Sequence, residues 1–537
     1  MQLFTVECEE HKYWVQNNIF YPLTYDIRDY ICTIILMKKF ISILLVALLV
    51  LVVSCKKNKF TDDPSANLNF SIDTLKFDTV FTTLGSTTKR FLIYNRNPEA
   101  VLISSIKLSG GSSSNFRINV NGQSAATFSD IEVRGNDSMF VFAEVTVDPN
   151  IQSNPFVIID QIQFTTNGNA QTVVLSAWGQ NAYYYKPNLF LNGLPPISHI
   201  SDYPDYYPIS NNITLPNDKP HVIFGFLMVD SATTLTISAG TQLHFYDQSG
   251  LWAYRGSVLN VNGAAGNEVV FQGTRLESSF EDLPGQWDRI ILNEGPADHT
   301  FNNAIIKNAF IGIQAEEFYL DGVPELATNK VKLFNTIIKN SGGLGMLVRN
   351  HNIQADNTLI TNSGNILLAI QGAGTHEYLH TTIANYSSGS RSDESLFMSN
   401  YFTLPTSDGG QIEVAGDLNV TFNNSIIYGT IEEEILTDSL TSALFEYAFH
   451  NCVLKTLKDT LDPGLSGKFF NITQNPSTPN SNAIYDPLFD DPYNDVFLLN
   501  DSSRAIAKGS LALTDTLLID LKGDAREMIP AVGSYEK

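Results

Sequence analysis

Short runs of alternating hydrophobic and polar residues fill the chain between residues 70 and 178. Examples are FLIYN, VLISSIKLSG, FRINVNG, SMFVFAEVTVDP and TVVLSAWG, which are separated by Gly, Asn, Asp or Pro. Alternation with a period of two places every second side chain on one face of a strand, and the separating residues favour turns. Several short strands at this spacing predict an antiparallel β-sandwich over residues 69–182.

The pattern changes near Leu235, where short β-branched runs are interrupted by glycines, as in LTISAGTQLHF and GSVLNVNGAAGNEVVFQG. A longer run then repeats: FNNAIIKNAFIGI starts at Phe301 and returns as FNTIIKNSGGLGM at Phe334. A helical solenoid would need longer amphipathic segments with a period of 3.6 residues. These runs are too short, too β-branched and too rich in Gly for helices, so they predict stacked strands.

One asparagine of this repeat recurs along the chain, with His380 in the same register. The successive spacings are 32, 22, 23, 44 and 27 residues, which indicates a solenoid with loop insertions. In a parallel β-helix, equivalent residues of successive coils stack, so an asparagine at one corner can form a ladder of hydrogen-bonded amides. The predicted ladder comprises Asn303, Asn335, Asn357, Asn424 and Asn451.

The predicted fold class is therefore all-β, with a sandwich followed by a parallel β-helix over residues 221–537. Residues 183–220 are rich in Tyr and Pro and have no period, so we interpret them as a linker or cap. In the repeat itself, the Ile pair is expected to point into the core. Lys307 and Lys339 are expected to be exposed and not to form a catalytic pair.

Both parts resemble known families. The order FLIYNRN, FRINV, VTVDP and TVVLSAWG resembles immunoglobulin-like modules of the ASPM/SPD-2/Hydin type, although VTVDP lacks the usual aromatic residue before Pro. The repeats and the segment GQWDRIIL resemble right-handed parallel β-helix proteins of the pectate-lyase-like superfamily from Bacteroidota, over roughly residues 220–537. These resemblances imply the fold and leave activity open.

The C-terminal segment resembles the terminal motif of the same β-helix proteins. Lys508 and Ser534 depart from it, because the family often has an acidic or amide residue at the first position and Ala at the second. The matching residues are Asp486, Pro487, Phe489, Gly509, Asp520, Gly523, Arg526, Gly533, Tyr535 and Glu536.

The beginning of the chain predicts export. Met37-Lys38-Lys39 precedes an apolar run over residues 40–53, which is too short to span a bilayer but typical of a signal peptide. The following VVSC resembles a bacterial lipobox, which implies cleavage after residue 54 and lipidation of Cys55. Residues 1–36 are then a mis-called upstream start, and residues 55–68 form a polar tether. This predicts a lipoprotein of the outer membrane, and the face on which it is displayed stays open.

Composition narrows the partners. A formal net charge of −23 argues against nucleic acid, since phosphate binding needs clustered Lys and Arg. Beyond the first 55 residues Cys452 is the single cysteine, so an intrachain disulfide there is excluded and a buried structural thiol is expected.

Candidate catalytic groups are few. The acidic side chains near the C-terminus, Asp486, Asp490, Asp491 and Asp495, are expected to cap turns. The other acidic candidates are Glu316-Glu317 and Glu432-Glu433-Glu434, expected in solvated loops, and Asp288-Arg289, expected in a structural turn.

A metal site was considered at one further pair. His376 and His380 are four residues apart, which on a strand places them on one face. No acidic or Cys partner recurs at a coil step, so no metal or cofactor is predicted there.

Two functional hypotheses follow. The first is a lipid-anchored envelope protein whose β-helix is a non-enzymatic scaffold that binds glycan or another envelope protein. The alternative is a lyase or hydrolase of acidic polysaccharide, with Ca²⁺ under the lyase mechanism and a site in the insertions near residues 316–330 or 386–416. The sequence leaves the ligand and the oligomeric state open.

Overall fold

A computed structural model describes most of the chain after the predicted tether. The signal peptide and Cys55 lie outside the described residues. Among the described residues, no helix is long and apolar enough to cross a membrane. The described residues are 59–147, 156–202, 211–317, 324–387, 389, 391–406, 409–458, 461–474, 486–514 and 517–537.

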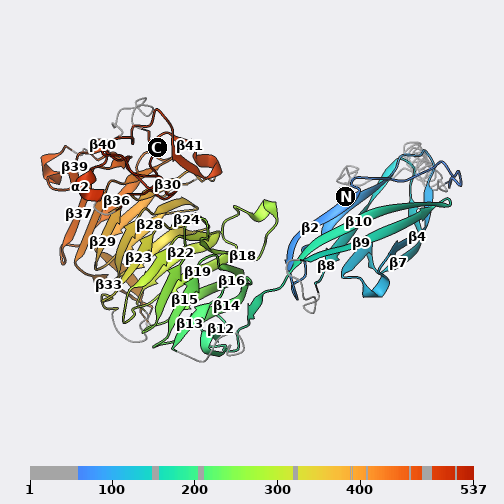
Figure 1. The fold of residues 1–537 in the computed structure, drawn as a ribbon, viewed down its shortest axis with the longest axis horizontal. Helices are drawn as coiled ribbons and strands as arrows, with labels where there is room; N and C mark the ends of the chain where they lie inside the picture. The colour runs from blue at the N-terminus through green and yellow to red at the C-terminus, as the bar shows by residue number, and fades with distance from the viewer. Residues whose placement is uncertain are drawn as a thin grey trace, which may run out of the picture.

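The N-terminal part is a β-sandwich of two five-stranded sheets (Figure 1). Its neighbouring strands are antiparallel except β2 and β10, which are parallel. One sheet has the order β1 (Asn69–Phe70), β3 (Lys89–Asn95), β8 (Asp137–Val145), β5 (Phe116–Val120), β6 (Gln123–Ser124). The other has the order β2 (Thr74–Phe81), β10 (Asn169–Gln180), β9 (Phe156–Thr166), β4 (Val101–Leu108), β7 (Thr127–Val133).

Alternation in the sequence explains this core. In β10, Val173, Leu175 and Ala177 are fully buried between the sheets, while the residues between them are partly exposed. The inward-facing side chains of both sheets form one hydrophobic cluster. The predicted sandwich is confirmed, since each strand buries one face only.

The remainder is a parallel β-helix, as predicted, and every strand pairing described within its two long sheets is parallel. The ten-stranded sheet comprises β13 (Asn212–Leu215), β15 (Thr234–Ser238), β17 (Val258–Asn262), β20 (His299–Asn302), β23 (Lys330–Phe334), β26 (Asn352–Asp356), β29 (Gly374–Leu379), β34 (Leu418–Asn423), β37 (Phe445–His450) and β39 (Phe469–Phe470).

The eighteen-stranded sheet wraps around two sides of the solenoid, because β16 pairs with β18 through its first half and with β19 through its second. Its strands are β11 (Tyr183–Tyr185), β12 (Ile197–His199), β14 (His221–Val229), β16 (Gln242–Ala253), β18 (Val269–Gly273), β19 (Trp287–Leu292), β21 (Ala304–Lys307), β22 (Ala309–Glu316), β24 (Ile337–Ser341), β25 (Leu344–Arg349), β27 (Leu359–Ser363), β28 (Leu368–Gln371), β30 (Thr382–Asn385), β31 (Leu396–Ser399), β35 (Ile426–Gly429), β36 (Ile435–Asp438), β38 (Val453–Leu454) and β40 (Thr473–Gln474).

The first coil starts inside the segment interpreted as a linker or cap. Strands β11 and β12 pair with β14, and β13 pairs with β15, all in parallel register. The absence of a hydrophobic period in this segment reflects how short these strands are, since three residues show little alternation.

Stacked side chains fill the interior of the coils. Aromatic rings of successive coils lie nearly parallel, as in Tyr378 over Phe422 at 4.4 Å and Phe422 over Phe449 at 5.2 Å between ring centroids. Of each repeated isoleucine pair, only the second member enters this core: Ile306 and Ile338 are fully buried inside, whereas Ile305 and Ile337 face outward. The expectation that both point inward is therefore wrong, because neighbouring strand residues face opposite sides.

The C-terminal segment packs on the outside of the later coils (Figure 1, dark red). It contains the hairpin β41 (Phe489–Asp491) and β42 (Val496–Leu499) and the short helix α2 (Leu511–Thr514). Its apolar side chains cover the outward-facing residues of the coils, which include Leu359, Ile426 and Val453. A second hairpin, β32 (Tyr401–Pro405) and β33 (Gln411–Ala415), lies in the predicted insertion near residues 386–416.

Candidate functional site

The asparagines of the expected ladder share one backbone conformation. Their φ angles are 46° at Asn303, 48° at Asn335, 46° at Asn357, 48° at Asn424 and 53° at Asn451. This is the left-handed region, which Asn enters more readily than most residues. Asn357 Nδ2 donates to Asn335 Oδ1 at 3.0 Å, and Asn335 Nδ2 donates to Asn303 Oδ1 at 3.4 Å. We refer to these five residues as the first asparagine row.

The C-terminal segment covers the later members of the first asparagine row. Asn357 Nδ2 donates to Ile519 O at 2.8 Å, and Asn357 Oδ1 accepts from Arg526 Nη2 at 2.6 Å. Asn424 exchanges two hydrogen bonds with Ser510. The row therefore turns the chain and docks the C-terminal segment, and these amides are engaged within the protein.

A second asparagine of the same repeat was not predicted from the sequence. It is the Asn of Ile-Ile-Lys-Asn, and it recurs in left-handed conformation at Asn308, Asn340 and Asn362, with φ angles of 65°, 56° and 52°. We refer to these three residues as the second asparagine row. The repeated K-N in the two quoted runs was the available signal.

Asn340 and Asn362 of the second asparagine row line a polar cavity of about 440 Å³ on the flank of the β-helix. This volume lies within the roughly 300–1,000 Å³ typical of ligand pockets. Its lining is Asp282, Pro284, Asn340, Ser341, Gly342, Asn362, Ser363, Gly364, Tyr386, Ser387, Tyr493, Asn494 and Asp495. The C-terminal segment supplies the last three of these residues and so forms one wall.

A second cavity of about 320 Å³ adjoins the first. Pro284 lines the first cavity and Gly285 the second, and the backbone of Gly285 approaches Gly342 closely. The second cavity is lined by Asp247, Gln248, Gly285, Trp287, Asp288 and Phe310. We refer to the two cavities together as the flank groove.

Each cavity of the flank groove has an exposed aromatic ring in its lining. Phe310 of the second cavity is 50% exposed, and Tyr493 of the first cavity is 66% exposed. Tyr493 packs edge-on against Tyr386 with 5.5 Å between ring centroids. Successive coils approach closely at Gly342 and Gly364, because a Cβ at Gly364 would overlap the carbonyl of Gly342.

Lys339 is the centre of the polar network beneath the groove. Its Nζ lies 2.8 Å from Asp495 Oδ2 and 3.3 Å from Asp282 Oδ1. Asn340 Nδ2 donates to the same two carboxylates, and Asn362 Nδ2 donates to Asp495. The Lys339 side chain is only 23% exposed, so the expectation of an exposed lysine is wrong. The backbone of Asp495 ends a short 3₁₀ helix in left-handed conformation, and its side chain joins this network.

The pKa values oppose proton transfer by this pair. Burial lowers the pKa of Lys339, but the hydrogen bond and charge of Asp495 outweigh it, so the net pKa is raised. Burial raises the pKa of Asp495, and the contacts with Lys339 outweigh that effect and lower it. Both groups therefore stay charged near neutral pH, which suits neither a general base nor a general acid. Lys307 differs, since burial and the charge of Lys339 lower its pKa.

Other acidic candidates pair within the protein. Asp288 contacts Arg289 at 2.8 Å, and Glu316 lies 3.5 Å from Arg349. Glu434 is fully buried and forms an ion pair with Arg391, so the expectation of a solvated loop is wrong for this residue. Its carboxylate also accepts from the hydroxyl and backbone of Ser395, which shows why burial is tolerated.

The two candidate histidines are separated by the end of a strand. His376 points into the coil interior from β29, whereas His380 lies beyond the strand with φ 49°. His380 Nε2 lies 3.0 Å from Thr514 Oγ1. The described residues contain no group of three His, Cys, Asp or Glu side chains that could hold a metal ion.

Cys452 is buried in the core, as expected for a structural thiol. Burial raises the pKa of its thiol to about 12. A thiol in this state is a poor nucleophile near neutral pH, because the thiolate is the reactive form.

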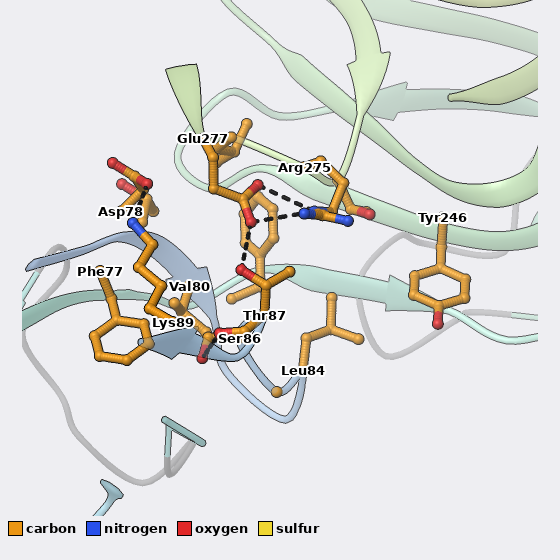
Figure 2. Close-up of a pocket in the computed structure, with 15 residues that line it drawn as sticks. Phe77, Asp78, Val80, Leu84, Ser86, Thr87, Lys89, Tyr246, Arg275 and Glu277 are labelled. Carbon is orange, nitrogen blue, oxygen red and sulfur yellow. Dashed lines mark hydrogen bonds and ion pairs between the residues drawn. The ribbon is translucent and has the colours of Figure 1, made fainter. Parts of the chain in front are cut away.

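A smaller cleft lies where the sandwich meets the β-helix (Figure 2). Thr87 Oγ1 donates to Glu277 Oε1 at 2.8 Å, and Arg275 Nε donates to the same carboxylate at 3.1 Å. The cavity is only about 90 Å³, well below the volume of a ligand pocket. The hydrogen bond between Thr87 and Glu277 joins the two domains, and Arg275 holds the Glu277 carboxylate from within the β-helix.

Comparison with known proteins leaves the function open. No protein-family model and no curated protein matches the chain. Similar solved structures include a family 123 glycoside hydrolase from Clostridium perfringens, described for glycolipid glycan hydrolysis, at 11% identity and a TM-score of 0.16. Another is the periplasmic chaperone SfaE, at 10% identity and a TM-score of 0.16.

Both similarities are partial. Each covers 21% of this chain, together with 26% of the hydrolase and 58% of the chaperone. At these TM-scores neither similarity carries an argument about fold or function.

Proposed function

We propose that this protein is a lipid-anchored, exported protein of the outer membrane that binds glycan in the flank groove without cleaving it. The observation that carries the proposal is the groove itself: stacked amides and hydroxyls from successive coils lie between exposed aromatic rings. Sugars present hydroxyl groups at their edges and C–H groups on their faces, and such a surface satisfies both. The lipid anchor at Cys55 rests on the lipobox and places the groove at the cell envelope.

The length of the groove favours an oligomer over a single sugar. Hydrogen bonds link neighbouring coils along the groove. Gly343 N donates to Phe310 O, Asn365 N donates to Gly343 O, and Tyr386 N donates to Asn362 Oδ1. These are three coil steps, and at about 4.8 Å for each step they extend roughly 14 Å along the solenoid axis. An extended chain laid along the axis contacts equivalent residues of several coils.

The alternative is a lyase or hydrolase of acidic polysaccharide. The carboxylates Asp282 and Asp495 near two lysines favour it, since such enzymes use carboxylates and a basic residue. The raised pKa of Lys339 and the lowered pKa of Asp495 weigh against it. The groove also draws only Tyr386 and Ser387 from the insertion near residues 386–416.

Binding and cleavage are separated by one set of measurements on the chain without its signal peptide. Calorimetric titration with oligosaccharides tests binding, and assays for reducing ends and unsaturated products test cleavage. We expect saturable binding and no product. Sustained turnover on any polysaccharide would replace the binding function with the enzymatic alternative.

Two variants locate the site. Tyr493→Ala removes the exposed ring and should weaken binding about three- to tenfold, which corresponds to the roughly 0.5–1.5 kcal/mol of an aromatic contact. Phe190→Ala is the matched control, because Phe190 is 70% exposed, lies in the first coil between β11 and β12, and is not among the residues that line the groove. Equal effects of the two substitutions would place the glycan elsewhere.

The anchor is tested separately by Cys55→Ala. We expect this variant in the soluble fraction of lysed cells, whereas the unaltered protein fractionates with the outer membrane. Unchanged membrane association of the variant would contradict lipidation at Cys55.

A further inference from the structure

The charges of the flank groove have a consistent arrangement. Among the residues that the structure describes, its lining contains four carboxylates and no Lys or Arg. The carboxylates are Asp247, Asp282, Asp288 and Asp495. The surface that a ligand meets is therefore made of carboxylates, amides, hydroxyls and aromatic rings.

Three cations lie near the flank groove, and two of them, Lys339 and Arg289, are held by carboxylates of the protein itself, whereas Lys307 lies beside Lys339 and is not among the residues that line either cavity. Lys339 contacts Asp495 and Asp282. Arg289 contacts Asp288 and donates through Nη1 to Gln314 Oε1 at 2.6 Å. An anionic ligand could recruit either cation only by breaking these contacts, which would leave a carboxylate without its partner in a partly buried position.

The same pairs reduce the attraction of the groove for cations. The charge of Asp495 is compensated by Lys339 and by the amides of Asn340 and Asn362. The exposed rings of Phe310 and Tyr493 and the amides of Asn340 and Asn362 suit flat, uncharged rings with hydroxyl edges better than a basic peptide.

We propose that the flank groove selects uncharged, hydroxyl-rich polysaccharides and rejects acidic ones. This inference rests on the proposed glycan-binding function and names its ligand class. Carboxylate oxygens such as those of Asp282 accept hydrogen bonds from sugar hydroxyls, whereas they repel the carboxylate or sulfate groups of acidic polysaccharides. The long-range field of a chain with a formal net charge of −23 acts in the same direction.

The test compares neutral and acidic oligosaccharides of matched length. The neutral probes are fragments of β-glucan, xylan and mannan, and the acidic probes are oligogalacturonate and oligoalginate. Calorimetric titration at low and high salt measures both sets, with oligolysine as a third probe. We expect at least one neutral probe to bind at least about tenfold more tightly than every acidic probe.

Variants assign the selectivity to the groove. Asp282→Asn removes a negative charge from the groove and one of the carboxylates that hold Lys339. Acidic probes should therefore bind severalfold more tightly, and the difference in affinity between neutral and acidic probes should become smaller. Glu446→Gln is the control. Glu446 lies on β37, in the ten-stranded sheet, and its exposed carboxylate pairs with Lys468. Thermal unfolding of both variants verifies that they are folded.

The remaining outcomes have distinct meanings. Acidic probes that bind as tightly as neutral ones would overturn the inference and leave glycan binding in place. Tighter binding of oligolysine, with a strong salt dependence, would overturn it in favour of a basic peptide ligand. Failure of every glycan probe to bind would instead overturn the proposed function.

Discussion

The two asparagine rows come from one repeat yet have different surroundings. Both consist of residues in left-handed conformation at corners of successive coils. The C-terminal segment packs over the first row at Asn357, Asn424 and Asn451. At the second row the same segment contributes Asp495, which accepts from the amides of Asn340 and Asn362, and a groove remains beside them. The comparison teaches that the repeat sets the geometry of an asparagine, while the segment packed against it decides how much of the surrounding surface stays open.

The Arg526–Glu536 pair holds the cover of the first row in place. Arg526 is fully buried, and its Nη1 lies 3.4 Å from Glu536 Oε2 while Nη2 donates to Asn357. Burial lowers the pKa of Arg526 to about 10, and the charge of Glu536 partly offsets this effect. Because the two residues also belong to the terminal motif, that motif acts as a clamp on the first row.

The largest expected effect comes from acid, which weakens the interior that both rows share. Burial lowers the pKa of His351 to about 4 and that of His376 to about 3, with smaller contributions from neighbouring histidines. The unfolded chain has a histidine pKa of about 6.5, so below that pH it binds more protons than the folded chain. Stability is therefore complete above about pH 6.5 and falls as the pH drops toward 4.

Denaturant unfolding between pH 7 and pH 5 measures this effect. We expect a loss of several kcal/mol, since each of these histidines contributes about 2 kcal/mol at pH 5. The variant His376→Gln should lose less stability between pH 7 and pH 5 than the unaltered protein does, because it lacks one of the two histidines that take up a proton on unfolding. Glycan binding by the still-folded fraction should change little, because the pKa of Asp495 is lowered and its carboxylate stays ionised. A profile without a slope in this range would contradict neutral buried histidines.

Removing the clamp is the next largest change. Arg526→Ala leaves the Glu536 carboxylate buried without its partner, and breaking a buried pair in this way costs about 3–5 kcal/mol. Chemical denaturation measures the loss. Lys522→Ala is the control, because its pair with Asp524 is exposed and screened by solvent and should contribute little to stability. Similar losses in both variants would show that the clamp does not stabilise the first row.

Breaking the pair under the second row should cost less stability and more function. Lys339→Met leaves Asp495 without its cation, but the amides of Asn340 and Asn362 still donate to it. We expect a loss of about 1–3 kcal/mol, below that of Arg526→Ala because Lys339 is partly exposed. Glycan affinity should fall as well, whereas Arg526→Ala should leave it unchanged in the folded protein. If Lys339→Met bound glycan with unchanged affinity, the polar network around Lys339 would not contribute to the glycan-binding site.

Much of the fold could be predicted from local patterns, because coil repeats and strand alternation are written in consecutive residues. The first row was found in this way, because its spacings are near 22 residues, twice that value, or longer by the length of a loop insertion. Asp495 was not placed beside Lys339, because 156 residues separate them and only tertiary packing joins them. Glu434 was misjudged for a related reason: a run of three glutamates indicates solvent, and its partner Arg391 lies on a distant loop.

The smallest effect compares the backbone and side-chain roles of single asparagines. Asn335→Ala keeps a Cβ in the left-handed conformation at φ 48° and removes the amide that accepts from Asn357. Backbone strain and the lost hydrogen bond should together lower the free energy of unfolding by about 2 kcal/mol. Asn335→Gly tolerates the conformation and should cost about 1 kcal/mol or less. Asn340→Gly should likewise be mild for stability but should weaken glycan binding, because it removes the amide shared by Asp282 and Asp495. Denaturation and titration of the three variants measure both quantities. If Asn335→Gly were as costly as Asn335→Ala, the amide and not the left-handed backbone would explain why the repeat uses asparagine.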